Sequence, residues 1–305
     1  MLRIVEAGGA EDRRMVLRDG RTLGWAEYGD AQGRPVIAVH GSPDSRRIWA
    51  LLHAGARAHG LRLVCPDRPG FGLSDPNPTH SVLGWVDDLR QLVEHLKIDR
   101  FPVVAISGGG EYGCAVAWRM HEQVSGLGLF SVIGPLSHKG ALAGTNRRVK
   151  SVYTMARLTP FLLRLLLRAM VRTAQRDPSK ASARPVASRP PEDRAVFERP
   201  AVRAALLANL PEQFRDADSM LREFRIAVQP WPMPVAEIGV PTEVWQGGRD
   251  DVHTPAMAEH LVAAIPQATL TLRPDFATFS FLDDLDPILR TLAKWSEPVS
   301  TDVEQ

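Results

Sequence analysis

The residues best suited to chemistry lie in one short stretch, where Ser107 stands between an apolar run and three glycines. Residues 103–106 read Val-Val-Ala-Ile, which is typical of a strand buried on both faces. Residues 111–120 repeat apolar side chains at helical spacing. A serine between a strand and a helix must adopt a strained backbone, and the helix N-terminus places positive dipole beneath its hydroxyl. This pattern favours a nucleophilic serine.

The same stretch has a second interpretation, a glycine-rich phosphate-binding loop at a helix N-terminus. No Gly-Lys-Ser/Thr follows the glycines and no GxGxxG pattern fits them, so we favour the nucleophile. Ala105 and Gly109 are small enough for the sharp turn of a small-x-Ser-x-Gly nucleophile elbow. Catalysis by such a serine would also need a base, an acid and an oxyanion hole from the rest of the chain.

The elements that must position Ser107 alternate between strand and helix, which predicts a mostly parallel α/β sheet. An antiparallel hairpin is expected around the turn at Asp19-Gly20. The further strands are expected at 36–39, 61–65, 103–106, 127–133, 242–246 and 269–272. Helices are expected at 48–58, 82–96, 111–120, 256–264 and 287–295.

The alternation stops between Pro135 and Pro234, where no convincing strand occurs. Helices are expected at 202–210 and 216–228, and a Pro/Ser/Arg-rich linker at 176–194. We therefore predict a core of residues 1–135 and 235–305, with residues 136–234 inserted after the sixth strand as a helical cap. Such a cap would cover the sheet edge where open α/β sheets bind ligands. The arginine-laced apolar segment 161–171 is interpreted either as a lid helix packed on the core or as a membrane-surface helix.

The composition narrows the class of protein. A chain of 305 residues, 44% of them hydrophobic, is expected to form one large domain or a core with an insertion. A net charge of +2, with arginines spread along the chain, does not favour nucleic acid as a partner. No run of ~18 apolar residues predicts a membrane span, and residues 1–14 lack the apolar run of a signal peptide. Cys65 and Cys114 form no disulfide framework. We expect a cytoplasmic location, with homodimerisation left open.

Three ordered motifs resemble the α/β-hydrolase superfamily, and the resemblance extends over nearly the whole chain. They are His40-Gly41-Ser42-Pro43, Asp67-Arg68-Pro69-Gly70-Phe71-Gly72-Leu73-Ser74, and Ser107-Gly108-Gly109-Gly110-Glu111-Tyr112. The bacterial hydrolases with His-Gly-x-Pro-Gly and Ser-Gly-Gly-Gly-Pro-Tyr segments are similar. The resemblance implies an eight-stranded, mostly parallel sheet flanked by helices, with Ser107 at the nucleophile position.

The resemblance also assigns the other parts of a catalytic site. It implies oxyanion donors at the backbone N–H of Gly108 and in the loop after His40-Gly41, where Ser42 is the candidate because Pro43 has no N–H. The acid is expected after the next-to-last strand, where Asp250 and Asp251 both occur. Counting from the flanking elements favours Asp250, whereas the Thr254-Pro255 pair favours Asp251. We take Asp250 as the acid.

The base is the point at which the chain departs from the family pattern. Family members carry a histidine in a loop after the last strand, and Thr278 stands at that position here. No histidine follows His260 in the sequence. Threonine cannot accept a proton near neutral pH, and loss of the base costs a triad roughly 10⁶ in turnover. We therefore expect an incomplete triad in which another group serves as base, or a reaction that needs none.

Several other side chains are candidates for that work. Glu111, in the first turn of the helix after Ser107, is either a helix-dipole partner or a general acid or base. His253 and His138 follow strands that end on the expected active edge, and either is a surface histidine or a substitute base. Asp44, beside the expected oxyanion hole, would repel an oxyanion if it pointed inward. No spacing suggests a metal site, and no cofactor is expected.

Three functions remain open on these residues. The first is an enzyme acting on a small or medium apolar ester, lactone, thioester or amide. The second is a non-hydrolytic lyase or cyclase that uses the oxyanion hole and carboxylates such as Glu111 or Asp44. The third is a ligand-binding protein without turnover, although the intact Ser107 argues against it. Each of the three implies a small-molecule ligand in a pocket over Ser107.

Overall fold

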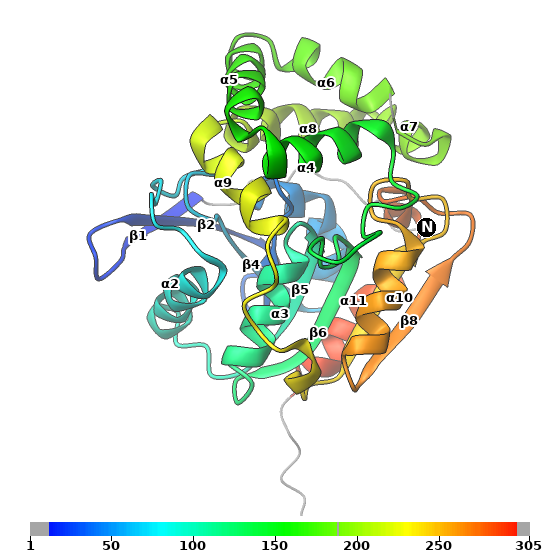
Figure 1. The fold of residues 1–305 in the computed structure, drawn as a ribbon. Helices are drawn as coiled ribbons and strands as arrows, with labels where there is room; N and C mark the ends of the chain where they lie inside the picture. Colours follow the sequence, from blue (N-terminus) through cyan, green and yellow to red (C-terminus); the bar gives the residue numbers. More distant parts are fainter. Residues whose placement is uncertain (1–11, 188, 298–305) are drawn as a thin grey trace, which may run out of the picture.

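An eight-stranded sheet forms the centre of the protein (Figure 1). The computed structural model describes residues 12–187 and 189–297, with only the backbone of residues 182–185. In space the strands follow the order β1-β2-β4-β3-β5-β6-β7-β8. They are β1 (Asp12–Val16), β2 (Thr22–Gly29), β3 (Arg34–Val39), β4 (Leu61–Pro66), β5 (Phe101–Ser107), β6 (Val124–Val132), β7 (Thr242–Gly247) and β8 (Ala268–Arg273).

The sheet confirms the predicted fold class. β1 pairs with β2 and β2 with β4 in antiparallel register, while the remaining neighbours pair in parallel. The first two strands form the hairpin expected around Asp19-Gly20, with Gly20 at a φ of 87° in the turn. β5 lies between β3 and β6 and is buried along its length up to the half-buried Ser107. The strand that carries Ser107 is therefore held on both edges and both faces.

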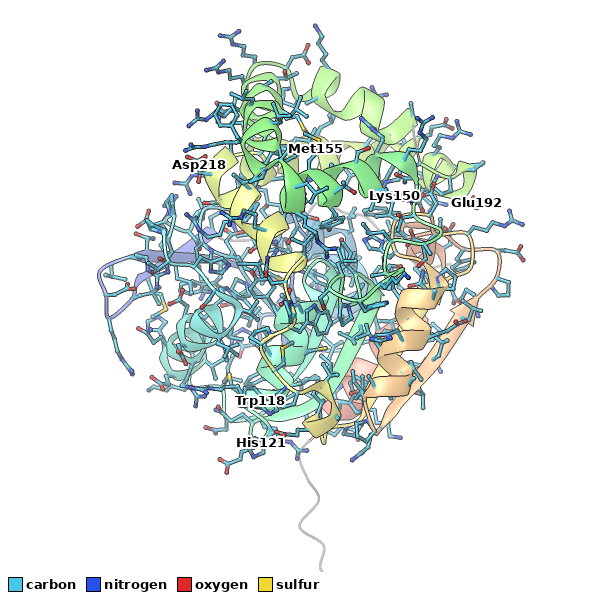
Figure 2. All side chains as sticks on the ribbon, viewed as in Figure 1. Trp118, His121, Lys150, Met155, Glu192 and Asp218 are labelled. Atoms are coloured by element: carbon cyan, nitrogen blue, oxygen red, sulfur yellow. The ribbon has the colours of Figure 1, made fainter. Side chains whose placement is uncertain are left out.

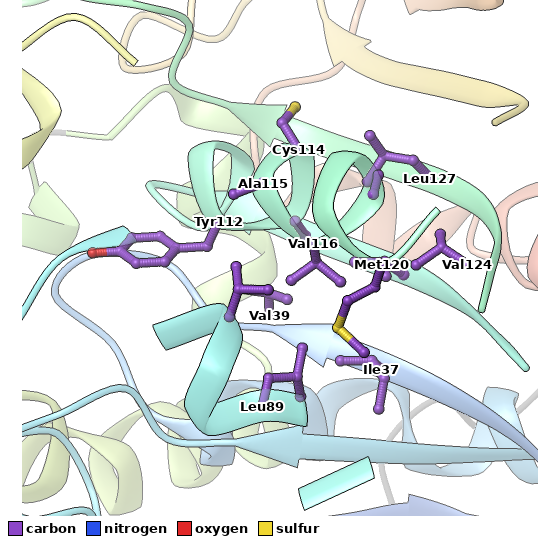
Figure 3. Close-up of a cluster of buried hydrophobic side chains, with 14 of the residues drawn as sticks. Ile37, Val39, Leu89, Tyr112, Cys114, Ala115, Val116, Met120, Val124 and Leu127 are labelled. Carbon is purple, nitrogen blue, oxygen red and sulfur yellow. The ribbon is translucent and has the colours of Figure 1, made fainter. Parts of the chain in front are cut away.

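Helices cover both faces of the sheet, as predicted. One face packs against α2 (Val82–His95), α3 (Gly110–Arg119) and α10 (Pro255–Ala264). Figure 3 shows Val116 of α3, and Met120 directly after this helix, against Ile37 and Val39 of β3. The other face packs against η1 (Arg46–Leu52), α1 (His53–Ala58), η3 (Ser280–Asp283) and α11 (Asp286–Trp295). These two apolar layers supply most of the burial that stabilises the sheet.

The segment between β6 and β7 forms a helical layer at one end of the sheet (Figure 1). Its helices are α4 (Arg147–Leu158), α5 (Pro160–Arg176), α6 (Pro178–Ala187), α7 (Pro191–Phe197), α8 (Pro200–Gln213) and α9 (Ala217–Ala227), and the short η2 (Val235–Glu237) precedes β7. A third apolar cluster joins α4, α5 and α9 to Phe71, in the segment after β4, and to Ile133, directly after β6. Figure 2 labels Lys150 and Met155 in this layer, with Trp118 and His121 at the opposite end of the molecule.

One expectation within this layer is wrong. The linker predicted at 176–194 is mostly helical, because α6 and α7 occupy much of it. The prolines that suggested a linker include Pro178 and Pro191, the first residues of these two helices. A proline at the first helical position costs little, since its missing N–H has no partner within the helix. In the described part of the chain no helix has the length and apolarity needed to cross a bilayer. Residues 1–11, which bear on the signal-peptide expectation, lie outside it.

Candidate active site

Ser107 ends β5 in a backbone conformation that few residues other than glycine adopt. Its φ is 54°, and α3 begins three residues later at Gly110. A Cβ built on Gly109 would lie 2.5 Å from the carbonyl oxygen of His40, so no larger residue fits there. Strain of this kind costs of order 1–3 kcal/mol and persists where the surrounding structure enforces it. The turn leaves the Ser107 side chain half-buried at the pocket floor.

A histidine lies against the Ser107 hydroxyl, and it comes from the loop after β7. His253 Nε2 is 2.8 Å from Ser107 Oγ, and His253 Nδ1 is 3.1 Å from Asp250 Oδ2. With the proton on Nδ1, the imidazole donates to Asp250 and accepts from the Ser107 hydroxyl. Both His253 and Asp250 are buried. The three side chains have the mutual geometry of a nucleophile, a base and the group that orients the base.

The loop after β7 is folded back by its own polar groups, which brings His253 over Ser107. Asp250 Oδ1 accepts hydrogen bonds from the backbone N–H groups of Val252 and His253, both at 2.9 Å. Gln246 Nε2 donates to the carbonyl oxygen of His253 at 2.6 Å. The loop therefore turns tightly enough for residues 250 and 253 to face each other. Asp251 is half-buried and accepts a hydrogen bond from Asn146 in the layer above.

Thr278 occupies the far side of the Asp250 carboxylate. Its Oγ1 donates to Asp250 Oδ2 at 2.6 Å and lies 3.4 Å from His253 Nδ1. Burial alone would raise the pKa of Asp250, but the His253 ring and the hydrogen bond from Thr278 hold this pKa below its usual range. Asp250 thus carries a negative charge beside the imidazole.

These contacts bear on the expectation that another group takes the place of the missing histidine. The loop after β8 carries no histidine, as the sequence states, but an imidazole from the loop after β7 fills the space beside Ser107. Of the two substitutes for the base that the sequence offered on this edge, only His253 makes this contact. His138 is exposed and stacks on His260, with ring centroids 4.6 Å apart.

The two expected oxyanion donors lie beside Ser107 in adjoining backbone segments. A Cβ built on Gly108 would be 3.2 Å from the backbone nitrogen of Ser42, so the two segments are in close contact. Within the described residues, neither the Ser42 nor the Gly108 N–H donates to another protein group. Gly41 leaves the space above the nucleophile open, because a Cβ there would lie 3.4 Å from Ser107 Oγ.

Asp44 borders the same small space. Its Oδ2 is 3.7 Å from the position where a Gly41 Cβ would stand, and the residue lines the pocket. Asp44 Oδ1 accepts hydrogen bonds from Asn209 Nδ2 at 2.5 Å and from the Ser45 N–H at 2.9 Å. Burial raises the pKa of Asp44 to about 6 despite these bonds. Its charge therefore changes close to neutral pH.

A buried ion pair supports the segment 40–42, which carries the expected oxyanion donor Ser42 and is called the oxyanion loop below. Arg68 Nη1 donates to the carbonyl oxygen of His40 at 2.5 Å, and Nη2 donates to that of Gly41 at 2.6 Å. Glu223, on α9 of the helical layer, accepts from Arg68 Nε and Nη2, both at 3.1 Å. Ser42 Oγ also donates to Glu223, at 2.5 Å. Burial would raise the pKa of Glu223, but Arg68 and the hydrogen-bond donors around it hold this pKa well below its usual range.

Glu111 makes no hydrogen bond to Ser107 among the described residues. It is buried at the start of α3, where its Oε1 has no hydrogen-bond partner among the described residues. Burial, reinforced by the charge of Glu223, raises the pKa of Glu111 well above its usual range. The structure thus gives Glu111 no contact with the nucleophile that a general acid or base would need.

A mostly apolar pocket of about 630 Å³ opens over Ser107 and His253. This volume suits a small or medium ligand. Its walls come from the sheet edge and from the helices of the layer above: Val152, Met155, Leu163, Leu166, Leu167, Met170, Leu206, Leu210, Phe214, Met220 and Phe224 contribute. Arg147 and Arg189 add positive charge to the lining.

Sequence reasoning missed Arg68, Glu223 and Asn209 as parts of the site. Arg68 lies within a quoted motif, but nothing in the sequence pairs it with a glutamate 155 residues further on. The spacing of Asp250 and His253 was a usable signal, since a carboxylate that caps a turn can face a side chain three residues later.

The comparisons with known proteins identify the family of this chain. The model of the alpha/beta hydrolase family matches residues 36–283, which is most of the chain. The chain belongs to the alpha/beta hydrolase family. The match includes every residue of the site described above, from Gly41 to Thr278.

Curated relatives match over shorter segments. A cis-3-alkyl-4-alkyloxetan-2-one decarboxylase of Xanthomonas campestris is 30% identical over 125 residues, 38% of this chain and 41% of that protein. A non-heme chloroperoxidase of Streptomyces lividans is 31% identical over 123 residues, 40% of this chain and 45% of that protein. The matched region therefore spans less than half the length of these relatives.

Solved structures match over almost the whole chain. A hydrolase from Pseudomonas aeruginosa has a TM-score of 0.69 at 18% identity, covering 95% of this chain and 100% of its own. An enol-lactonase from Burkholderia xenovorans has a TM-score of 0.66 at 19% identity, with 93% and 99% covered. At these identities the likeness establishes the fold alone.

Proposed function

We propose that this protein is a serine hydrolase of small or medium apolar carboxylic esters or lactones, with Ser107 as nucleophile, His253 as base and Asp250 as the orienting acid. The observation that carries the proposal is the 2.8 Å contact between His253 Nε2 and Ser107 Oγ. Membership of the family supports a hydrolase. The relative from Xanthomonas is named for an alkyl-substituted four-membered lactone, which supports the substrate class.

The proposed reaction has two halves. Ser107 Oγ attacks the substrate carbonyl carbon while His253 Nε2 takes the hydroxyl proton, and the N–H groups of Ser42 and Gly108 stabilise the oxyanion. His253 then protonates the departing alkoxide, which leaves an ester on Ser107. A water molecule gives its proton to His253 and attacks that ester, releasing the acid and restoring the hydroxyl. Asp250 keeps the imidazole in the required tautomer throughout.

The substrate class follows from the pocket. Its lining is mainly leucine, methionine, phenylalanine and valine, which suits an apolar acyl or alkyl group. We also propose that residues 136–234 act as the cap of this pocket, because α4, α5, α8 and α9 provide much of its wall.

A fluorophosphonate probe and a series of p-nitrophenyl esters test the proposal. The natural chain should be labelled and should hydrolyse acyl chains of two to eight carbons, whereas Ser107→Ala should do neither. His253→Ala should lower kcat/KM by roughly 10⁴ to 10⁶, as loss of the base does in serine hydrolases. The matched control is His138→Ala, an exposed histidine whose removal should leave both measurements unchanged.

Two outcomes would overturn the proposal. An unlabelled, inactive natural chain with an intact fold would favour the lyase, cyclase or binding functions. Labelling that survives His253→Ala at the natural rate would remove the imidazole from the mechanism.

A further inference from the structure

The exposed large apolar side chains of this protein gather on one part of the helical layer. Outside it, the described residues expose only Val16 and Leu272 of this kind. The others lie at the end of α4 and along α5: Leu158 (70% exposed), Phe161 (68%), Leu162 (51%), Leu165 (47%), Leu166 (53%) and Met170 (42%). We call these six residues the apolar face. Contiguous exposed apolar surface of this kind marks an interaction site.

The helical period explains why α5 has apolar residues left over after packing. Leu163, Leu167, Val171 and Ala174 form the buried stripe that joins the third apolar cluster. Leu162, Leu166 and Met170, at i, i+4 and i+8, form the neighbouring stripe that stays exposed. Phe161 and Leu165 widen it further. The apolar surface of α5 is therefore wider than the part of it that packs against the protein interior.

All charged side chains on α4 and α5, the two helices that carry the apolar face, are positive. Residues 147–176 contain no aspartate or glutamate, and they carry Arg147, Arg148, Lys150, Arg157, Arg164, Arg168, Arg172 and Arg176. Asp218 of α9 pairs with Arg164, at 2.5 Å and 2.6 Å, and lies 3.8 Å from Arg168. Arg172 and Arg176 are exposed further along α5. Figure 1 shows α5 in the layer farthest from the sheet.

We propose that the apolar face docks this protein on the surface of an anionic lipid bilayer. Exposed leucine and phenylalanine beside lysine and arginine is the combination with which amphipathic helices enter the interface of negatively charged membranes. A second copy of the chain is a poorer occupant, because it would bring the same unbalanced positive charge against this one. Leu166 and Met170 also line the pocket, so the docked face would open it toward the acyl chains. That last step rests on the proposed function, whereas docking itself does not.

Sedimentation with sucrose-loaded vesicles tests the docking, using the Ser107→Ala chain so that no reaction interferes. Vesicles of phosphatidylcholine with 30% phosphatidylglycerol should bind it in 0.1 M salt, and pure phosphatidylcholine vesicles should not. Raising the salt to 0.5 M should weaken binding, since screening shortens the reach of the arginines. The variant Phe161→Gln/Leu162→Gln/Leu165→Gln should bind at least tenfold more weakly. Arg172→Gln/Arg176→Gln should bind roughly thirtyfold more weakly, at about fivefold per cation.

Controls remove groups of the same kind elsewhere on the protein. Val16→Gln deletes an exposed apolar residue of β1, and Arg100→Gln/Arg119→Gln deletes two exposed cations. Arg119 directly follows Trp118 in the chain. Figure 2 shows Trp118 and His121 at the end opposite the helical layer. Both controls should bind as the parent chain does, and circular dichroism melts should confirm that every variant folds.

Three results would overturn the docking proposal. The first is that the parent chain does not bind anionic vesicles. The second is that the apolar triple variant and the double arginine variant both bind as tightly as the parent. The third is that the parent forms a dimer, which the apolar triple variant does not form, and binds no vesicles. The last would assign the face to a second copy. Because esters in free solution test hydrolysis separately, failure of docking and failure of the proposed function are distinguishable.

Discussion

The hydroxyl of Thr278 donates a hydrogen bond to Asp250 Oδ2 at 2.6 Å, at the position where family members carry a histidine. The same carboxylate oxygen is 3.1 Å from His253 Nδ1. Thr278 therefore supports the carboxylate that we propose orients the base, while the imidazole approaches from a different loop. Thr278 would thus act on the reaction only through Asp250, as a positioning residue, and substitutions of Thr278 can measure this effect on kcat/KM.

Thr278→Val should lower kcat/KM by about 5- to 30-fold, because Asp250 loses one of its hydrogen bonds and holds the imidazole less firmly. Thr278→Ser keeps the hydroxyl and should stay within about threefold of the natural chain. Ester kinetics across pH 5 to 9, with melting temperatures alongside, would check both. A larger loss in the serine variant than in the valine variant would show that the methyl group, rather than the hydroxyl, matters.

Thr278→His should reduce activity instead of raising it. An incomplete triad would gain from a histidine here, but His253 already stands beside Ser107. A second imidazole next to the buried Asp250 would overpack the site, at about 1–3 kcal/mol, and compete for the carboxylate. The same assay checks this prediction, and a faster variant would show that His253 is not the working base.

Asp44→Asn should raise kcat/KM above pH 6 by up to about tenfold. Because burial raises the pKa of Asp44 to about 6, the group is neutral below this pH and negative above it, next to the space where the oxyanion would form. A negative charge there opposes the developing charge at modest distance. The ratio of variant to natural kcat/KM should be near one at pH 5 and rise through pH 6. A flat ratio would contradict this electrostatic effect.

Glu111→Gln should stabilise the fold, increasingly so at higher pH. The raised pKa of Glu111 means that its contribution to stability is fully present below its unfolded pKa, near 4.5, and is lost as pH rises through the folded value. Because Oε1 has no hydrogen-bond partner among the described residues, we expect the neutral amide to stabilise the fold by roughly 1–3 kcal/mol. Urea unfolding at pH 4.5 and pH 8 measures the difference, with exposed Glu198→Gln as control. Unchanged ester turnover would accompany a purely structural role.

Glu223→Gln should destabilise the protein by about 3–5 kcal/mol, because Arg68 would remain buried without its countercharge. Turnover should fall as well, since Arg68 holds the carbonyl groups of His40 and Gly41 in the oxyanion loop. Asp218→Asn on the same helix is the matched control. Its half-exposed pair with Arg164 contributes at most about 1 kcal/mol. Urea unfolding and ester kinetics should separate the two variants, and equal destabilisation would refute this account.

The fold could be predicted from the sequence because its signals are local. The strand and helix periods around Ser107, the hairpin at Asp19-Gly20 and the loss of rhythm after Pro135 each follow from neighbouring residues. The linker at 176–194 was predicted wrongly for the same reason. Prolines at the start of α6 and α7 have the composition of a linker but also suit the first turn of a helix.

The sequence by itself determined the family, the serine at the end of β5 and the absence of a histidine after β8. Only the tertiary structure decided that the imidazole of His253 lies beside Ser107. The direction of the imidazole depends on how hydrogen bonds from Asp250 and Gln246 fold the loop after β7 back toward the end of β5. The pairing of Arg68 with Glu223 was likewise decided in three dimensions. Contacts between residues so distant in the chain depend on how the helical layer packs on the sheet, and residue type and spacing do not specify that packing.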